Sequence, residues 1–178
     1  VSIDLPAIGA DFLVSSSNKC IEGVPGFVFV LAKKTALVAL EGRSRTVALD
    51  LFAQWRGLEQ DGQFRFTPPT HAILAFHRAL DELDAEGGVL GRNRRYLDNQ
   101  QVLLAGMKEL GFRSYLPAAV QGPIIATFRY PADPRFDFAE FYRRLADLGF
   151  VIYPGKLTQE ACFRVGNIGR IGSEHVRA

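Results

Sequence analysis

A single lysine stands in a stretch whose residue types suit covalent chemistry. Lys19 follows the polar run Ser-Ser-Ser-Asn at 15–18 and precedes the glycine-rich run Glu-Gly-Val-Pro-Gly at 22–26. A lysine amine presented this way could hold an aldehyde as a Schiff base. An arginine cannot do so, because a guanidinium stays protonated. Composition by itself favours the simpler interpretation of a solvated loop lysine.

The residues around this stretch predict strands that hold the lysine in a loop. Residues 11–14 and 27–32 are short apolar runs on either side of it, and loops held by a rigid scaffold often carry functional residues. We therefore expect Lys19 where a strand gives way to a loop. Residues 1–5 and 36–40 are further strand candidates. Short runs of this kind are typical of a largely buried sheet.

The middle of the chain predicts helices. Apolar residues recur at helical spacing over residues 45–60. Residues 70–86 and 89–110 predict two further helices, each ended by glycine. The Pro-Pro pair at 68–69 interrupts the chain between the first and second of these helices. The basic cluster Arg-Asn-Arg-Arg at 92–95 falls within the last helix, and we expect it to be a solvated helix face.

The last third of the chain predicts a small α+β domain. Residues 123–130, 151–153 and 162–165 are strand candidates. Asp137 is expected to cap a helix that ends at Gly149.

Composition and charge indicate a globular protein with no nucleic-acid partner. The 178 residues are 48% hydrophobic, which is enough to bury a core. The formal net charge is only +2, with basic and acidic residues interspersed. The 2 cysteines are too few and too far apart to suggest a disulfide framework or a metal site. We find neither a signal peptide nor an apolar run of membrane length, and expect a cytoplasmic protein that does not bind membranes.

Blocks of sequence along nearly the whole chain resemble the class V aminotransferases. Residues 16–26, Ser-Ser-Asn-Lys-Cys-Ile-Glu-Gly-Val-Pro-Gly, resemble the cofactor-lysine segment of that family. The resemblance continues through Trp55, through Arg-Phe-Thr-Pro-Pro-Thr-His at 65–71, and through Cys-Phe-Arg-Val-Gly-Asn-Ile-Gly at 162–169.

The resemblance implies an α/β fold, namely the end of a fold type I large domain that binds pyridoxal 5′-phosphate, followed by a small α+β C-terminal domain. The limits that it implies are 1–45 for the incomplete end of the large domain, 46–66 for a linking helix and loop, and 67–178 for the small domain.

The resemblance also implies roles for individual residues. Lys19 would be the catalytic residue and would bind the cofactor, pyridoxal 5′-phosphate. Thr67 would bind the cofactor phosphate of the neighbouring subunit in a homodimer. Sequence position alone instead favours Thr67 and Thr70 as helix-capping residues, and the two roles are compatible. Arg164 would grip the acidic group of the substrate, because a guanidinium can meet two oxygens at once. Arg170 is the alternative clamp.

Other residues of the right chemical type fit these roles less well. Lys33, Lys34, Lys108 and Lys156 lack the matching flanks, and we interpret them as surface charges. The cofactor also needs an acid opposite its pyridine nitrogen. Asp4 and Asp11 precede Lys19, but neither stands where the family places that acid.

Within the class, the sequences Asn-Lys-Cys and Phe-Arg-Val-Gly-Asn are most similar to the matching segments of members that use 2-aminoethylphosphonate. This implies transfer of its amino group to pyruvate, giving phosphonoacetaldehyde and alanine, as in phosphonate catabolism. An alanine-glyoxylate or serine-pyruvate type of transaminase is an alternative, as is a non-catalytic truncated fragment. Cysteine desulfurase is disfavoured, because Cys20 directly after the lysine does not match a mobile catalytic loop.

The chain is expected to be the C-terminal half of the enzyme. It does not begin with methionine, and Val1 already stands in a predicted strand. The acid, a glycine-rich phosphate loop and an aromatic residue that stacks on the cofactor would then precede it. We therefore expect the 178-residue chain alone to be inactive.

Overall fold

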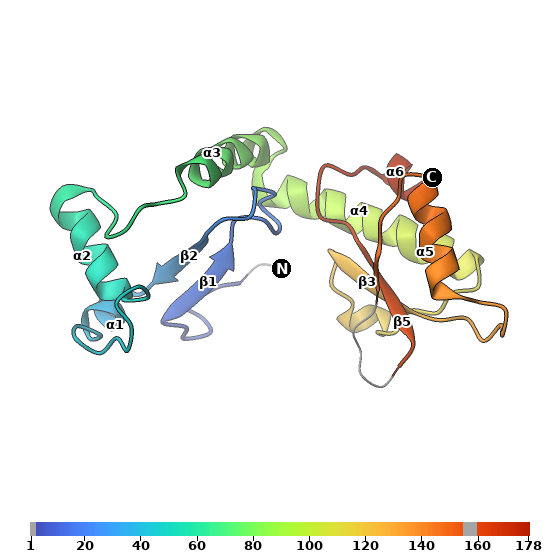
Figure 1. Ribbon diagram of the computed structural model, residues 1–178, viewed down its shortest axis with the longest axis horizontal. Helices are drawn as coiled ribbons and strands as arrows, with labels where there is room; N and C mark the ends of the chain where they lie inside the picture. Colours follow the sequence, from blue (N-terminus) through green and yellow to red (C-terminus); the bar gives the residue numbers. More distant parts are fainter. Residues whose placement is uncertain (1–2, 155–159) are drawn as a thin grey trace. The chain divides into compact units, whose positions relative to one another are not determined.

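The computed structural model of the protein describes residues 3–154 and 160–178. The chain forms two compact units, which we call unit 1 (Val1–Asp81) and unit 2 (Glu82–Ala178). A two-stranded sheet lies in unit 1 and a three-stranded sheet in unit 2 (Figure 1). Within the described residues, no helix combines the length and apolar character needed to cross a membrane.

An antiparallel strand pair forms the centre of unit 1. β1 (Phe12–Ser16) pairs with β2 (Val28–Ala32), which confirms the two strands predicted on either side of Lys19. One face of this pair carries Phe29, whose ring centroid lies 5.6 Å from that of Phe76 on α3 (Thr70–Ala85).

The opposite face of the strand pair is apolar and exposed. Val14 is 64% exposed and Val28 60% exposed, and both stand on the face away from Phe29. The described residues therefore leave Val14 and Val28 of this predicted sheet largely uncovered.

The helix predicted over residues 45–60 begins later than expected. α2 runs from Leu51 to Asp61 because Asp50 caps it, its carboxylate accepting a hydrogen bond of 2.9 Å from the amide of Ala53. Gly62 ends the helix in the left-handed conformation, with φ of 74°.

Two strands predicted in unit 1 are absent from the described residues. Residues 36–40 contribute instead to a short helix, α1 (Lys34–Val38), which buries Leu37. Residues 3–5 lead into a turn in which the Asp4 carboxylate accepts a hydrogen bond of 3.1 Å from the amide of Ala7. Residues 1 and 2 lie outside the described part of the chain.

In unit 2 the sheet has β5 (Cys162–Gly166) at its centre. β3 (Ile125–Arg129) and β4 (Tyr153–Pro154) flank it, and both are antiparallel to it. The strands predicted over 123–130 and 162–165 are thus confirmed. The one predicted over 151–153 is correct only from Tyr153 onward.

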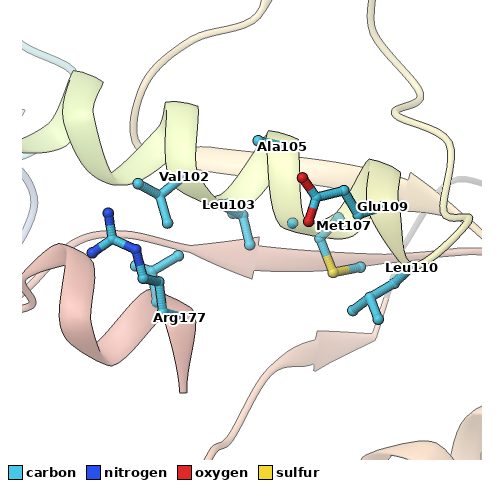
Figure 2. A pocket seen from close by; sticks show the side chains of 9 residues that line it. Val102, Leu103, Ala105, Met107, Glu109, Leu110 and Arg177 are labelled. Carbon is cyan, nitrogen blue, oxygen red and sulfur yellow. The ribbon is translucent and has the colours of Figure 1, made fainter.

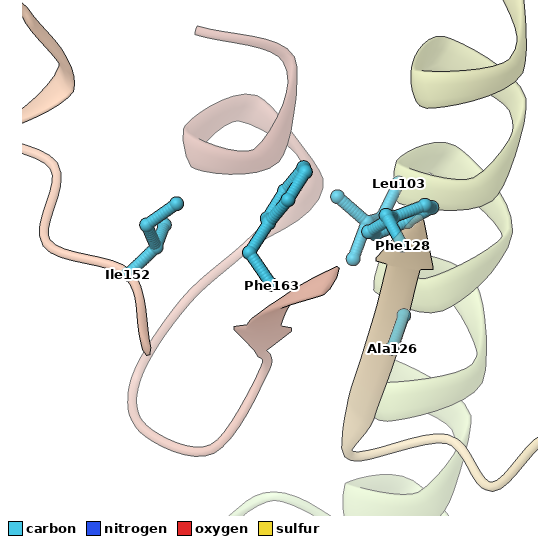
Figure 3. Close-up of a cluster of buried hydrophobic side chains, with 5 residues drawn as sticks. All are labelled: Leu103, Ala126, Phe128, Ile152 and Phe163. Atoms are coloured by element: carbon cyan, nitrogen blue, oxygen red, sulfur yellow. The ribbon is translucent and has the colours of Figure 1, made fainter. Parts of the chain in front are cut away.

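Helices cover one face of this sheet. α4 (Gly88–Glu109) contributes Leu103 to the core, and α5 (Phe138–Asp147) contributes Phe141. The ring of the fully buried Phe163 lies between them, 5.3 Å from that of Phe141. Figure 3 shows the central cluster, which consists of Leu103, Ala126, Phe128, Ile152 and Phe163.

The limits of the longer helices agree with the sequence prediction, and the described part of unit 2 also contains two short helices. α5 is capped by Asp137, whose carboxylate accepts a hydrogen bond of 2.7 Å from the amide of Glu140, and Gly149 follows it in the left-handed conformation. A 3₁₀ turn (η1) spans Ala118–Val120, and α6 spans Ser173–Arg177. The helices predicted over 70–86 and 89–110 are confirmed as α3 and α4.

The boundary between the two units falls inside α3. The first turns of this helix belong to unit 1, because Ala72 lies so close to Gly26 that a β-carbon at position 26 would come within 2.7 Å of that of Ala72. The domain limits implied by the family resemblance describe a complete enzyme, and they stay a prediction.

The basic cluster at 92–95 is not a solvated face. Arg92 is only 4% exposed, and its Nε lies 2.5 Å from a carboxylate oxygen of Glu86. Arg95 lies 2.6 Å from the other oxygen and also donates to the carbonyl of Gly169. The expectation was wrong because Glu86, just before the helix, accepts hydrogen bonds from both guanidinium groups.

These hydrogen bonds give unit 2 a pH-dependent stability. They lower the pKa of Glu86 below its ordinary value of 4.5, Arg95 contributing most. The stabilisation is complete above pH 4.5 and is lost as the pH falls through the lowered pKa. We expect Glu86→Gln to reduce the free energy of unfolding by about 1.5–3 kcal/mol at pH 7. Urea unfolding of the full chain should show this difference shrinking below pH 4.5.

The matched control is Asp84→Asn, which removes an exposed carboxylate nearby. It should leave the unfolding free energy nearly unchanged at every pH. A Glu86→Gln difference that persisted undiminished at pH 3 would contradict the assignment.

Candidate functional site

Lys19 lies in the loop between β1 and β2, as predicted. Its side chain is exposed, and the loop returns on itself directly after it. The amide of Glu22 donates a hydrogen bond of 2.8 Å to the carbonyl of Lys19. Glu22 has a φ of 64°, in the left-handed region that few residues other than glycine adopt. The backbone that presents the lysine is therefore a tight, specific turn.

Ser17 fixes the base of this loop. It is 0% exposed, and its hydroxyl donates a hydrogen bond of 2.7 Å to the carbonyl of Val24. Its own carbonyl accepts one of 2.9 Å from the amide of Gly23. These bonds tie the residues before Lys19 to the residues after it, so that the lysine stands on a closed loop.

Glycine is required where the loop closes. A β-carbon at Gly23 would lie 2.9 Å from the carbonyl oxygen of Ser17 and 3.1 Å from the ring of Phe76 on α3. Backbone cannot move away as a flexible side chain can, so a larger residue would open the turn. The glycine-rich run after the lysine is thus explained by close packing.

Thr67 lies in the extended segment before α3 and is exposed. With Phe66 and Pro68 it lines an open hollow of about 620 Å³ formed by residues 62–68. The carbonyl of Pro69 accepts the first helical hydrogen bond, at 3.1 Å from the amide of Ile73. Pro69 rather than Thr67 therefore takes the capping position, and the capping interpretation of Thr67 is wrong.

Side chains of α2 hold the segment that leads to Thr67. The amide of Arg65 donates a hydrogen bond of 3.3 Å to the side-chain oxygen of Gln54, and its guanidinium donates one of 3.0 Å to the carbonyl of Val47. The carboxylate of Asp50 lies 3.9 Å from the same guanidinium. The position of Thr67 thus depends on α2.

Arg164 occupies the middle of β5, the central strand of unit 2. It stands opposite Thr127 on β3 and Tyr153 on β4. Its Nε is buried, and within the described residues it has no hydrogen-bond partner. A buried donor on a charged group is costly unless an acceptor satisfies it. An anionic ligand would meet that need.

The competing charged residues have other partners. Lys33 lies 3.7 Å from Asp11, and Lys34 lies over the ring of Trp55 at 5.3 Å from its centroid. Lys108 is exposed on α4, and these three positions confirm the interpretation as surface charges. The prediction for Lys156 lies outside the described residues.

The predicted site residues fall in different units. Lys19 and Thr67 belong to unit 1 and Arg164 to unit 2. Sequence reasoning missed Ser17 and Tyr153 beside them. For Ser17 the available signal was the polar run just before the lysine. For Tyr153 it was the alternation of residue types in Val-Ile-Tyr at 151–153.

A hollow of about 450 Å³ in unit 2 lies between α4 and α6 (Figure 2). Val102, Met107 and Leu110 give it an apolar lining, with Glu109 and Arg177 also among its residues. It contains none of the predicted site residues. Of the two cysteines, Cys20 is exposed and Cys162 is buried.

The Ser17 hydrogen bond makes a testable contribution to the lysine loop. Ser17→Ala removes the donor to Val24, and we expect it to cost about 1 kcal/mol of stability. Amide hydrogen exchange at Gly23 should become faster, because that amide bonds the Ser17 carbonyl. Ser15→Ala, a half-buried serine on β1, is the control and should leave the Gly23 exchange rate unchanged. Equal rates in all three proteins would show that the hydroxyl does not hold the loop.

Comparison with known proteins places the chain in a family. The family model for class V aminotransferases matches residues 1–142. A 2-aminoethylphosphonate–pyruvate transaminase of Salmonella paratyphi B is 52% identical over 100% of this chain and 49% of its own length. One of Aeromonas hydrophila is 55% identical over 99% of this chain and 47% of its own length. The chain thus spans about half the length of the curated relatives it matches.

Solved structures show the same fold. An alanine–glyoxylate aminotransferase from Nostoc sp. superposes with a TM-score of 0.82 at 23% identity, over 99% of this chain and 48% of that chain. A pyridoxamine–pyruvate aminotransferase from Mesorhizobium loti gives a TM-score of 0.83 at 21% identity, over 99% and 46%. The predicted fold type I architecture is confirmed. The chain belongs to the class V aminotransferase family.

Proposed function

We propose that the enzyme to which this chain belongs transfers the amino group of 2-aminoethylphosphonate to pyruvate. The products would be phosphonoacetaldehyde and alanine, which places the reaction in phosphonate catabolism. The observation that carries the proposal is the 52–55% identity to transaminases of that name, which extends over 99–100% of this chain. Arg164, with its unpartnered buried Nε, supports an anionic substrate.

Pyridoxal 5′-phosphate is the cofactor that this family implies, and when bound it supplies an electron sink for a substrate carbanion. Lys19 would hold it through its amine. The same amine would act as the base that takes a proton from the substrate carbon and as the acid that returns it. The exposed position of Lys19 on a closed loop suits both tasks, because the amine is accessible and its backbone is fixed.

The described residues fit this cofactor in part. The Thr67 hydroxyl is exposed beside a hollow and suits a phosphate oxygen. The pyridine nitrogen needs an acid, but Asp11 pairs with Lys33 at 3.7 Å and Asp4 caps a turn. We propose that this acid comes from a part of the enzyme that precedes these 178 residues.

A cytoplasmic homodimer is part of the proposal. In the family, Thr67 would reach the cofactor of the neighbouring subunit. The residues around it support such a contact, because large apolar side chains are exposed there and a second copy would cover them. They are Val47 at 68%, Leu49 at 77%, Phe64 at 49% and Phe66 at 52% exposure.

The alternatives make different demands. An alanine-glyoxylate type of transaminase would use the same lysine with a carboxylate-only donor, and the solved structure of that name described above shares only 23% identity with this chain. A non-catalytic fragment would need no accessible lysine at all. Both are separated from the proposal by the next two experiments, carried out on the full-length enzyme.

Lys19 should be the residue that binds the cofactor covalently. Borohydride reduction of the holoenzyme followed by peptide mapping should place a pyridoxyl group on Lys19. Lys19→Arg keeps the charge but has no nucleophilic amine, and should lower kcat by at least about 10²-fold. Lys33→Arg is the control and should keep full activity. A pyridoxyl group on Lys33, Lys34 or Lys156 would contradict the assignment.

Arg164 should bind the acidic group of the substrate. Arg164→Ala removes charge-assisted hydrogen bonds that contribute about 1.5–3 kcal/mol, so KM for 2-aminoethylphosphonate should rise about 10- to 100-fold. The absorption spectrum of the bound cofactor should not change. Arg170→Ala, which removes an exposed arginine nearby, should leave KM unaltered. The reverse pattern would transfer the role to Arg170.

A further inference from the structure

The two acidic groups that Arg164 must bind differ in shape. This inference rests on the proposed function, in which one arginine serves both 2-aminoethylphosphonate and pyruvate. A carboxylate has two oxygens, and the fork of a guanidinium can bind both. A phosphonate has three oxygens, so the same fork leaves one of them without a donor. A second donor beside Arg164 would therefore favour the phosphonate.

The register of the sheet identifies the neighbours of Arg164. Side chains alternate between the two faces of a strand, and directly opposed residues share a face. Phe163 points into the core, so Arg164 points to the other face. Thr127 and Tyr153 stand directly opposite it on the two flanking strands and so lie on that same face. Each carries a hydroxyl that could donate a hydrogen bond.

Within the described residues of β3, β4 and β5, the other charged group on this face is already paired. Arg129 forms an ion pair with Glu160, and its guanidinium lies 4.8 Å from the ring centroid of Tyr115. Arg164 differs from it, because its Nε is buried without a partner in the described part of the chain. Among the described residues of these three strands, Arg164 is thus the guanidinium that suits a ligand, and two hydroxyls flank it.

The length of the side chains separates these two hydroxyls. Side chains in a sheet stand roughly perpendicular to it. The tyrosine hydroxyl stands at about the height of an arginine guanidinium, whereas the threonine hydroxyl stays at the level of the first side-chain carbons. Tyr153 is 62% exposed and is free to orient toward a ligand, while Thr127 is half-buried. Tyr153 can therefore reach a ligand held by Arg164, and Thr127 cannot.

We propose that the Tyr153 hydroxyl donates a hydrogen bond to the third phosphonate oxygen and so sets the preference for a phosphonate over a carboxylate amino donor. Arg164 holds two oxygens of the group and Tyr153 the remaining one. Pyruvate gains nothing from Tyr153, because both of its carboxylate oxygens are met by Arg164. Tyr153 would therefore affect binding of the amino donor in one half-reaction and not binding of pyruvate in the other, although both substrates use the same site.

The test is Tyr153→Phe in the full-length holoenzyme, which removes only the hydroxyl. Loss of one hydrogen bond to an anion should raise KM for 2-aminoethylphosphonate about tenfold. KM for pyruvate should stay the same, as should the inhibition constant of 3-aminopropanoate, the carboxylate analogue of the amino donor. Thr127→Val is the matched control, since it removes the hydroxyl on the other side of Arg164, and both KM values should remain those of the unsubstituted enzyme.

The outcomes separate this inference from the proposed function. An unchanged KM for 2-aminoethylphosphonate, or an equal rise for pyruvate, would overturn the role of Tyr153. A loss confined to Thr127→Val would assign the third oxygen to that residue instead. If the unsubstituted enzyme did not use 2-aminoethylphosphonate at all, the proposed function itself would fail. An unfolding temperature and a cofactor spectrum that are the same in all variants would exclude a general structural effect.

Discussion

The burial of Phe163 is the constraint on which the proposed substrate-binding face depends. Its ring contacts the core from β5, and the strand period of two residues then puts Arg164 on the opposite face. A slip of one residue would place the guanidinium in the core and the phenyl ring in water. Burying a phenylalanine contributes about 1.5–3 kcal/mol, and an unpaired buried charge costs more than that. The register is therefore fixed by both residues.

The lysine loop is held by hydrogen bonds rather than by apolar packing. Ser17 is as completely buried as Phe163, but it acts through hydrogen bonds to Val24 and Gly23. An apolar side chain could not satisfy the carbonyl of Val24. In both units, then, a fully buried residue within two positions of the proposed functional side chain helps to determine where that side chain stands.

Most elements of the fold could be predicted from sequence because their signals are local. α3, α4 and α5 combine helical periodicity with glycine stops, and β3 and β5 are rich in branched and aromatic residues. The errors arose where contacts distant in sequence decide the outcome. The burial of Arg92 depends on Glu86 and on packing of α4. Lys19 and Arg164 were predicted from family resemblance, whereas the place of Tyr153 beside Arg164 needed the strand pairing, which the alternation in Val-Ile-Tyr does not encode.

The chemistry of the described residues divides the proposed reaction into two parts. In the proposed function, Lys19, Thr67 and Arg164 would supply a nucleophile and donors, which would attach the cofactor and recognise anions. Making the cofactor an effective electron sink requires an acid at its pyridine nitrogen. The two acids that precede Lys19 in sequence, Asp11 and Asp4, are engaged with Lys33 and with a turn. The proposal therefore assigns attachment and recognition to the described residues, and electronic activation to an acid that they do not supply.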